Sequence, residues 1–230
     1  MAASSRNHAR GVKRQRTNGG AGRSQPRMLV VGQPGESKYF DTTVSGAALA
    51  VAGTVQSSSL NLISVGTGED EMVGRKVQLK SLTIKGRIEL PEEANASLSQ
   101  VPGAAAYRLV ILLDKQCNGA AATIADVFAD TDINSLLNLE NTGRFRILRD
   151  ISGSLETEVG HDGTSYFHGR AIKEFSEYIS LNLPLEFATQ AGGSRVIGEV
   201  KSNNLVVMAF SSGNDPTNAT WRARIRFSDK

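Results

Sequence analysis

The clearest hydrophobic pattern in the chain lies in residues 74–90, which are typical of one long β-strand in two registers. The apolar residues up to Leu79 have odd numbers, whereas those from Leu82 to Ile88 have even numbers. Successive side chains of a strand point to opposite faces, so one extra residue exchanges the two faces. The pattern therefore predicts a β-bulge at Lys80–Ser81.

Five further segments carry strand patterns of two kinds. Residues 107–113 and 205–210 are apolar at both parities, which predicts strands that are covered on both faces. Residues 144–149, 175–187 and 221–227 alternate between apolar and polar side chains, which predicts strands with one buried face.

The segments between these strands suggest connections and one short helical region. Small and β-branched residues in 37–65 predict an extended connecting arm with one or two weak strands. Thr123 precedes Ile124, Val127 and Phe128, whose spacing predicts a short helix with Thr123 as its N-cap. This helical insertion is a candidate cover for the outer face of a doubly apolar strand. About eight core strands, with helix confined to one insertion, favour an antiparallel sandwich or barrel.

Charge divides the chain into residues 1–35 and residues 36–230. Residues 1–35 hold seven of the 26 basic residues and none of the 23 acidic ones, which leaves the remainder with a net charge of −4. With few bulky apolar residues, this N-terminal arm should be disordered on its own. An arm without acids favours a polyanion partner over a solubilising tail. Its basic residues are Arg6, Arg10, Lys13, Arg14, Arg16, Arg23 and Arg27.

Basic residues also occupy the polar face of three predicted strands. A guanidinium group pairs bidentately with phosphate, so three such strands within one sheet would form a cationic plane that suits nucleic acid. A solvated sheet surface is the alternative, and the sequence alone does not show that the strands are neighbours. The candidate residues are Lys85 and Arg87, then Arg144 and Arg146, then Arg222, Arg224 and Arg226.

Patterns of catalysis and metal binding are weak in this sequence. His161, Asp162 and His168 lie together in a glycine-containing stretch, but two histidines seven residues apart are a poor metal signal. The single cysteine, Cys117, has no histidine near it in sequence, and no Gly-x-Ser-x-Gly motif is present. We therefore expect no enzyme, no metal and no cofactor. No run of 18 apolar residues occurs, so we expect no membrane partner.

The order of these segments resembles the capsid proteins of small circular Rep-encoding single-stranded DNA viruses, the CRESS-DNA group. It is also similar to the coat proteins of geminiviruses and of satellite tobacco necrosis virus. The residues that carry the resemblance are VGRKVQLKSLTIKGRI (73–88), YRLVILLDKQCNGA (107–120), INSLLNLENTGRFRILRD (133–150), EVKSNN (199–204) and RARIRFSD (222–229).

The resemblance implies an all-β fold, a single eight-stranded antiparallel jelly roll with BIDG and CHEF sheets. On this reading strand B is 75–90, C is 106–114 and D is 144–151, with the short helical insertion in the C–D loop. Strand H is 204–211 and strand I is 219–228. This alignment makes B, I and D neighbours in one sheet, and these are the three strands with basic faces.

The resemblance further implies a viral capsid protein that assembles with itself into an icosahedral shell, T=1 with sixty copies or geminate. Its jelly-roll shell domain would be 36–230, and the arm 1–35 would bind a single-stranded genome, with DNA favoured over RNA. Lys13–Arg16 matches a nuclear localisation signal, which adds a host import receptor as a partner. The expected locations are the virion and, during assembly, the host nucleus. A satellite-type RNA virus coat protein and a non-viral jelly-roll binding module such as a lectin are the alternatives.

Overall fold

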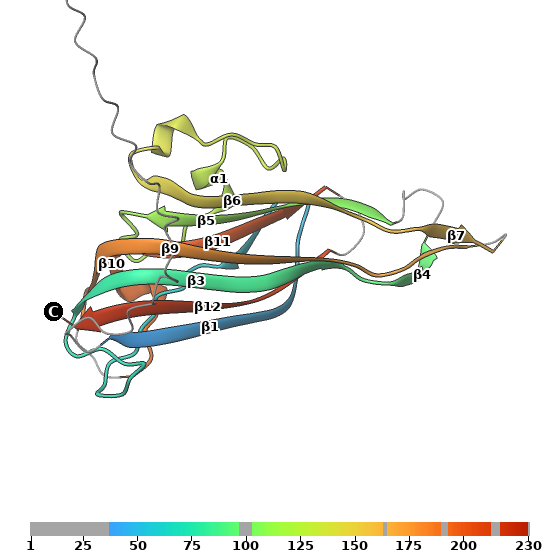
Figure 1. Ribbon diagram of the computed structural model, residues 1–230. Helices are drawn as coiled ribbons and strands as arrows, with labels where there is room; N and C mark the ends of the chain where they lie inside the picture. The colour runs from blue at the N-terminus through green and yellow to red at the C-terminus, as the bar shows by residue number, and fades with distance from the viewer. Residues whose placement is uncertain (1–36, 97–102, 163–164, 190–192, 213–216, 230) are drawn as a thin grey trace, which may run out of the picture. The chain divides into compact units, whose positions relative to one another are not determined.

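Two antiparallel β-sheets in the computed structural model pack face to face around a shared core. Figure 1 shows them as separate layers. The chain divides into two units, Met1–Gln33 and Pro34–Lys230, and every residue described below belongs to the second. The structure describes residues 37–96, 103–162, 165–189, 193–212 and 217–229.

The larger sheet has five strands in the order β1-β12-β3-β9-β10, and each neighbouring pair is antiparallel. The β3 strand is therefore hydrogen-bonded to β12 on one side and to β9 on the other. The bounds are β1 (Lys38–Ala48), β12 (Asn218–Asp229), β3 (Lys76–Leu90), β9 (Ala171–Phe187) and β10 (Val200–Ser202).

The second sheet has four strands in the order β2-β11-β5-β6, and a small third sheet has the order β4-β8-β7. The bounds in the second sheet are β2 (Thr54–Ser57), β11 (Asn204–Ser211), β5 (Ala104–Asp114) and β6 (Phe145–Glu156). Those in the third are β4 (Glu93–Ala96), β8 (Tyr166–His168) and β7 (Val159–His161). The described helices are α1 (Ile124–Val127) and two 3-10 turns, Leu139–Asn141 and Ile197–Glu199.

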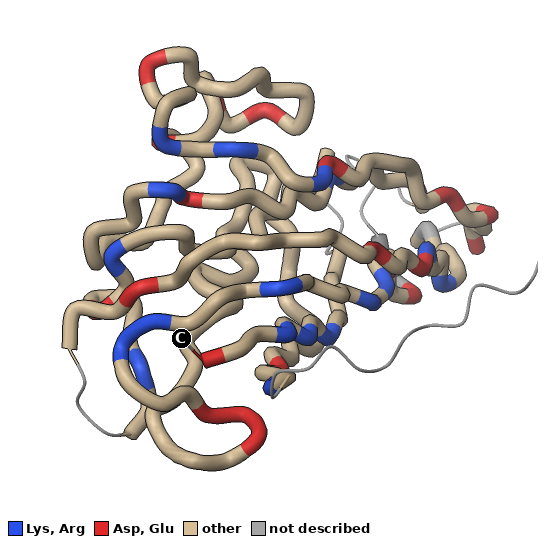
Figure 2. The backbone as a smooth tube through the Cα atoms, turned by 60° about the vertical axis from the view of Figure 1, so that its left-hand side comes forward, with Lys and Arg blue, Asp and Glu red and all other residues tan. Residues whose placement is uncertain are grey.

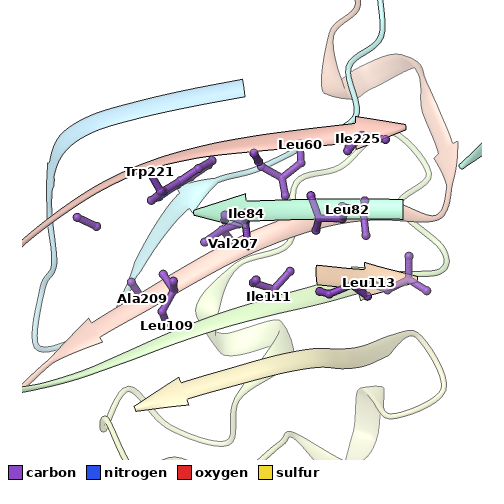
Figure 3. Close-up of a cluster of buried hydrophobic side chains, with 14 of the residues drawn as sticks. Leu60, Leu82, Ile84, Leu109, Ile111, Leu113, Val207, Ala209, Trp221 and Ile225 are labelled. Carbon is purple, nitrogen blue, oxygen red and sulfur yellow. The ribbon is translucent and has the colours of Figure 1, made fainter. Parts of the chain in front are cut away.

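The main core lies between the two large sheets. Leu82 and Ile84 of β3 and Trp221 of β12 face Ile111 of β5 and Val207 of β11, as Figure 3 shows. Each of these side chains is at most 1% exposed. Burial of a large aliphatic side chain contributes about 1.5–3 kcal/mol, so burial in this layer stabilises the packing of the two sheets.

The predicted bulge is confirmed at Lys80. In the ladder between β3 and β12, Phe227 pairs with Leu79 and Arg226 pairs with Ser81, so Lys80 is the extra residue. Lys80 is exposed, while Leu79 on one side and Leu82 on the other are fully buried. The bulge thus keeps both halves of β3 facing the core although their apolar residues differ in parity.

The two doubly apolar strands are confirmed as neighbours, because β5 pairs with β11 over the full length of β11. A second apolar cluster covers their outer face, where Val110 and Met208 pack with Val127 and Phe128 of the helical insertion. Thr123 caps α1 as predicted, since its hydroxyl accepts a hydrogen bond from the Asp126 N–H at 3.3 Å. The insertion therefore lies between β5 and β6 and shields a face that would otherwise be open to water.

Residues 37–65 contain two strands, as predicted, but the first of them is long rather than weak. The β1 strand is a full edge strand that pairs with β12 from Lys38 to Ala48, and β2 pairs with β11. Only Phe40 and Val44 of β1 pack against the main core, so the strand has too few large apolar residues to give a clear pattern. Residues 75–90, assigned to strand B by the resemblance, are therefore the third strand along the chain.

The prediction that residues 144–151 share a sheet with residues 75–90 and 219–228 was also wrong. These residues begin β6, which pairs with β5 in the four-stranded sheet. The chain leaves β5 at Asp114, passes through the insertion and returns at Phe145, which is directly opposite Asp114. An antiparallel partner that is next in sequence is the simplest pairing, and the alternation of residues 144–149 contains no information about it.

Candidate nucleic-acid interface

The outer face of the five-stranded sheet carries five exposed basic residues on two adjacent strands. The β12 strand buries Trp221, Ala223, Ile225 and Phe227, so the residues between them must face outward. The β3 ladder places Arg222 opposite Lys85 and Thr220 opposite Arg87. We define the cationic face as Lys85, Arg87, Arg222, Arg224 and Arg226.

The cationic face contains two adjoining shallow depressions that share Lys85 and Arg222. Side chains directly opposite in an antiparallel pair have Cβ atoms about 5 Å apart, so these cations lie close enough to contact one strand of phosphates. Figure 2 shows Lys and Arg positions gathered on neighbouring strands of this sheet. Hydroxyl groups line the same depressions as further hydrogen-bond donors, from Thr43, Thr83, Ser176 and Thr220.

Two of the five cations are already engaged by acids. Arg224 forms a two-pronged pair with Asp41 of β1, with Nε–Oδ1 and Nη2–Oδ2 distances of 2.7 and 2.6 Å. This hydrogen-bonded pairing lowers the pKa of Asp41 below its ordinary value. The Arg224 guanidinium also lies 4.6 Å from the ring centre of Tyr39. Arg87 contacts Glu89 at 3.1 Å.

The other three cations of the face have no acidic partner within salt-bridge distance in the described part of the chain. These residues are Lys85, Arg222 and Arg226, and all three side chains are exposed. An exposed cation keeps its hydration until an anion replaces it, so its contribution to subunit stability is small. Its contribution to binding a polyanion is larger, because each phosphate contact releases condensed counterions.

Arg144 and Arg146 are not part of the cationic face. Arg144 forms a two-pronged pair with Asp114, at 2.9 and 2.7 Å, and the Asp114 side chain is fully buried. Its guanidinium also lies 4.7 Å from the ring centre of Phe145. Arg144 therefore closes the β5–β6 end of the four-stranded sheet, while Arg146 is exposed on β6.

The structure thus brings together five of the predicted site residues and leaves two elsewhere. The seven basic residues of the arm, Arg6, Arg10, Lys13, Arg14, Arg16, Arg23 and Arg27, lie outside the described residues. Sequence reasoning missed the contribution of β1, namely Tyr39, Asp41 and Thr43. Their alternation with Phe40, Thr42 and Val44 was the available signal.

The candidate metal and cysteine chemistry receives no support from local geometry. Among the described residues, no group of three His, Cys, Asp or Glu side chains is arranged to hold a metal ion. Cys117 is 1% exposed, and burial raises the pKa of its thiol, which is the environment of an inert cysteine. No helix within the described ranges is both long and apolar enough to span a bilayer.

Fold and site together define an all-β protein of two packed antiparallel sheets, one of which presents a cationic outer face. The chain belongs to the geminivirus coat protein/nuclear export factor BR1 family, whose model matches residues 1–230. This membership supports a viral capsid protein, a structural rather than catalytic class, with the virion as its location. Comparison with curated proteins found no match.

Proposed function

We propose that this protein assembles into an icosahedral T=1 capsid and packages a single-stranded DNA genome through residues 1–35 and the cationic face. The observation that carries this proposal is the match of the whole chain to a coat protein family, combined with a sheet whose outer face bears three unpaired cations. Binding of this kind is driven by the phosphate backbone and depends strongly on salt.

The strand order supports a jelly roll with corrected strand letters. If β1, β2, β3 and β5 are B, C, D and E, and β6, β9, β11 and β12 are F, G, H and I, the two large sheets read BIDG and CHEF. The helical insertion then belongs to the E–F loop rather than to the C–D loop. The cationic face is the outer face of the BIDG sheet. In sequence, the arm comes just before β1, which is the edge strand of this same sheet.

Charge indicates which face of the subunit would point toward the inside of the shell. A shell that packages a genome encloses a polyanion, so the cationic face of each subunit would line the interior together with the arm. The insertion on the other sheet carries acids at Asp126, Asp130 and Glu140 and exposes Leu136 and Leu139 by 78% and 82%. Exposed leucines beside acids are suited to contacts between subunits rather than to nucleic acid.

Nuclear import during assembly is a further part of the proposal. Its support is the Lys13–Arg16 segment, a short basic pattern that an import receptor would recognise. The family description also names a nuclear export factor, which is consistent with this part of the proposal.

Electron microscopy and nuclease digestion of the purified full-length protein test this function directly. We expect closed particles of megadalton size that protect nucleic acid, and we expect a DNA-specific nuclease to degrade that cargo after the particles are opened. Degradation by ribonuclease instead would favour the satellite-type alternative. A small oligomer with no affinity for oligonucleotides would rule out the capsid proposal and favour a binding module.

The role of the cationic face is tested by removing its three unpaired cations. The combined variant Lys85→Ala, Arg222→Ala, Arg226→Ala should reduce the slope of log affinity against log salt for single-stranded DNA by about 2, at about 0.7 per phosphate contact. Fluorescence anisotropy with labelled oligonucleotides measures this slope. A control with the same loss of charge replaces cations elsewhere, Lys115, Arg146 and Lys201, with alanine. Equal slopes for the two triple variants would show that only net charge matters.

A further inference from the structure

One large aromatic side chain stands exposed at the edge of the cationic face. Tyr178 of β9 is 63% exposed, which is far above the exposure expected for a tyrosine that serves the core. Its neighbours on the same face of β9 are small, Ser176 and Ser180. The ring therefore has open space beside it and no large side chain from its own strand to cover it.

The register of the sheet places Tyr178 in line with the cations. Tyr178 pairs with Thr83 of β3, and Thr83 pairs with Arg224 of β12. In the next row Ser176 pairs with Lys85, which pairs with Arg222. Strands lie about 4.8 Å apart, so Tyr178 is one strand away from Lys85 and two strands away from Arg222.

A second tyrosine on this face, Tyr39, has its ring already covered by a cation. Tyr39 of β1 is partly buried, and the guanidinium of Arg224 lies over its ring. Arg149 donates hydrogen bonds to the Tyr178 carbonyl oxygen at 3.1 Å and to the Glu177 carboxylate at 2.8 Å rather than lying over the Tyr178 ring. The Tyr178 ring has no cation over it among the contacts of the described residues.

We propose that Tyr178 is a base-stacking platform, on which an unpaired base rests while Lys85 and Arg222 hold the neighbouring phosphates. A cationic track beside an exposed aromatic ring is the combination by which proteins hold single strands, because every base has a π-face. In a duplex the faces of the bases are occupied by stacking, so the platform gives the folded domain a preference for single strands. This inference rests on the proposed function and adds the recognition of bases to that of phosphates.

The test compares two single strands of equal length and equal charge, oligothymidylate and an abasic oligodeoxynucleotide. The full-length protein, freed of nucleic acid, should bind oligothymidylate more tightly. Residues 1–35 contain no Phe, Tyr or Trp, so the difference between the two ligands reports on the folded domain rather than on phosphate binding by the arm.

Three variants assign the preference to the ring. Tyr178→Leu keeps an apolar side chain without a π-face, and it should lower the affinity for oligothymidylate by about 5- to 150-fold while leaving abasic binding unchanged. Tyr178→Phe should stay within about twofold of the unmodified protein. Ile172→Ala is the matched control, because Ile172 is an exposed apolar side chain on the same face of β9, and it should change neither affinity.

Each outcome decides between the proposals. Failure of the unmodified protein to bind either ligand would overturn the proposed function itself. Equal binding of both ligands, or a Tyr178→Leu variant that keeps the preference, would overturn the platform and leave phosphate binding intact. A loss in Tyr178→Phe as large as that in Tyr178→Leu would assign the effect to a hydrogen bond of the hydroxyl and would also overturn stacking.

Discussion

Deletion of residues 2–27 should leave a folded protein that still forms particles, and those particles should contain almost no nucleic acid. The deleted segment carries all seven cations of residues 1–35, and the remainder of the chain has a net charge of −4. If each of these cations contacts one phosphate, the loss reduces the salt slope by about 5. The nucleic acid content of particles purified by sedimentation, read from their ultraviolet absorbance, measures the effect.

A charge-matched arm provides the control for this deletion. Replacing residues 2–27 with a segment of the same length and composition in scrambled order should restore packaging, because the proposed contacts depend on charge rather than on sequence. Particles of the deletion variant that are filled to the normal level would refute the role of the arm and would leave the cationic face as the sole binding element of the proposal.

Arg144→Ala should destabilise the subunit by roughly 3 kcal/mol, the lower end of the range for breaking a buried ion pair. The change leaves the fully buried Asp114 carboxylate with the Gln116 N–H as its remaining hydrogen-bond donor. We place the effect at the lower end because the Arg144 side chain is itself 26% exposed. Since whole domains are stable by only about 5–15 kcal/mol, urea denaturation should show a clear fall in the midpoint.

Arg146→Ala is the control for this prediction, because Arg146 lies two residues further along and is exposed. Its effect on stability should stay within about 0.5 kcal/mol. Equal midpoints for the two variants would contradict the structural role of the Arg144–Asp114 pair. A loss of oligonucleotide affinity in Arg144→Ala without a loss of stability would return Arg144 to the nucleic-acid interface.

The faces of the strands could be predicted from the sequence, whereas their neighbours could not. Alternation in Trp221–Phe227 and the change of parity at Lys80 report which side chains point inward, and the structure confirms both. Alternation does not show which strand is the hydrogen-bonded neighbour, so the pattern of residues 144–149 was equally compatible with either sheet.

The residues of the candidate site could also be predicted only in part, because the sequence does not show which residues become neighbours. Arg144 and Arg146 have the same spacing and chemistry in sequence, and they differ because Asp114, thirty residues earlier, lies opposite only one of them. The open ring of Tyr178 depends in the same way on small neighbours and on the register with Thr83. Local pattern therefore identifies candidate cations, and tertiary pairing selects among them.

The bulge at Lys80 makes β3 more sensitive to its length than to its composition. Many side chains fit at an exposed bulged position, so substitutions of Lys80 should change the stability of the subunit little. Loss of that one residue would turn Lys85 and Arg87 toward the interior of the sandwich, or force Leu79 and Val77 into solvent. In any lineage that carries this strand, codon substitutions at position 80 should accumulate freely while single-codon deletions between residues 77 and 84 are purged.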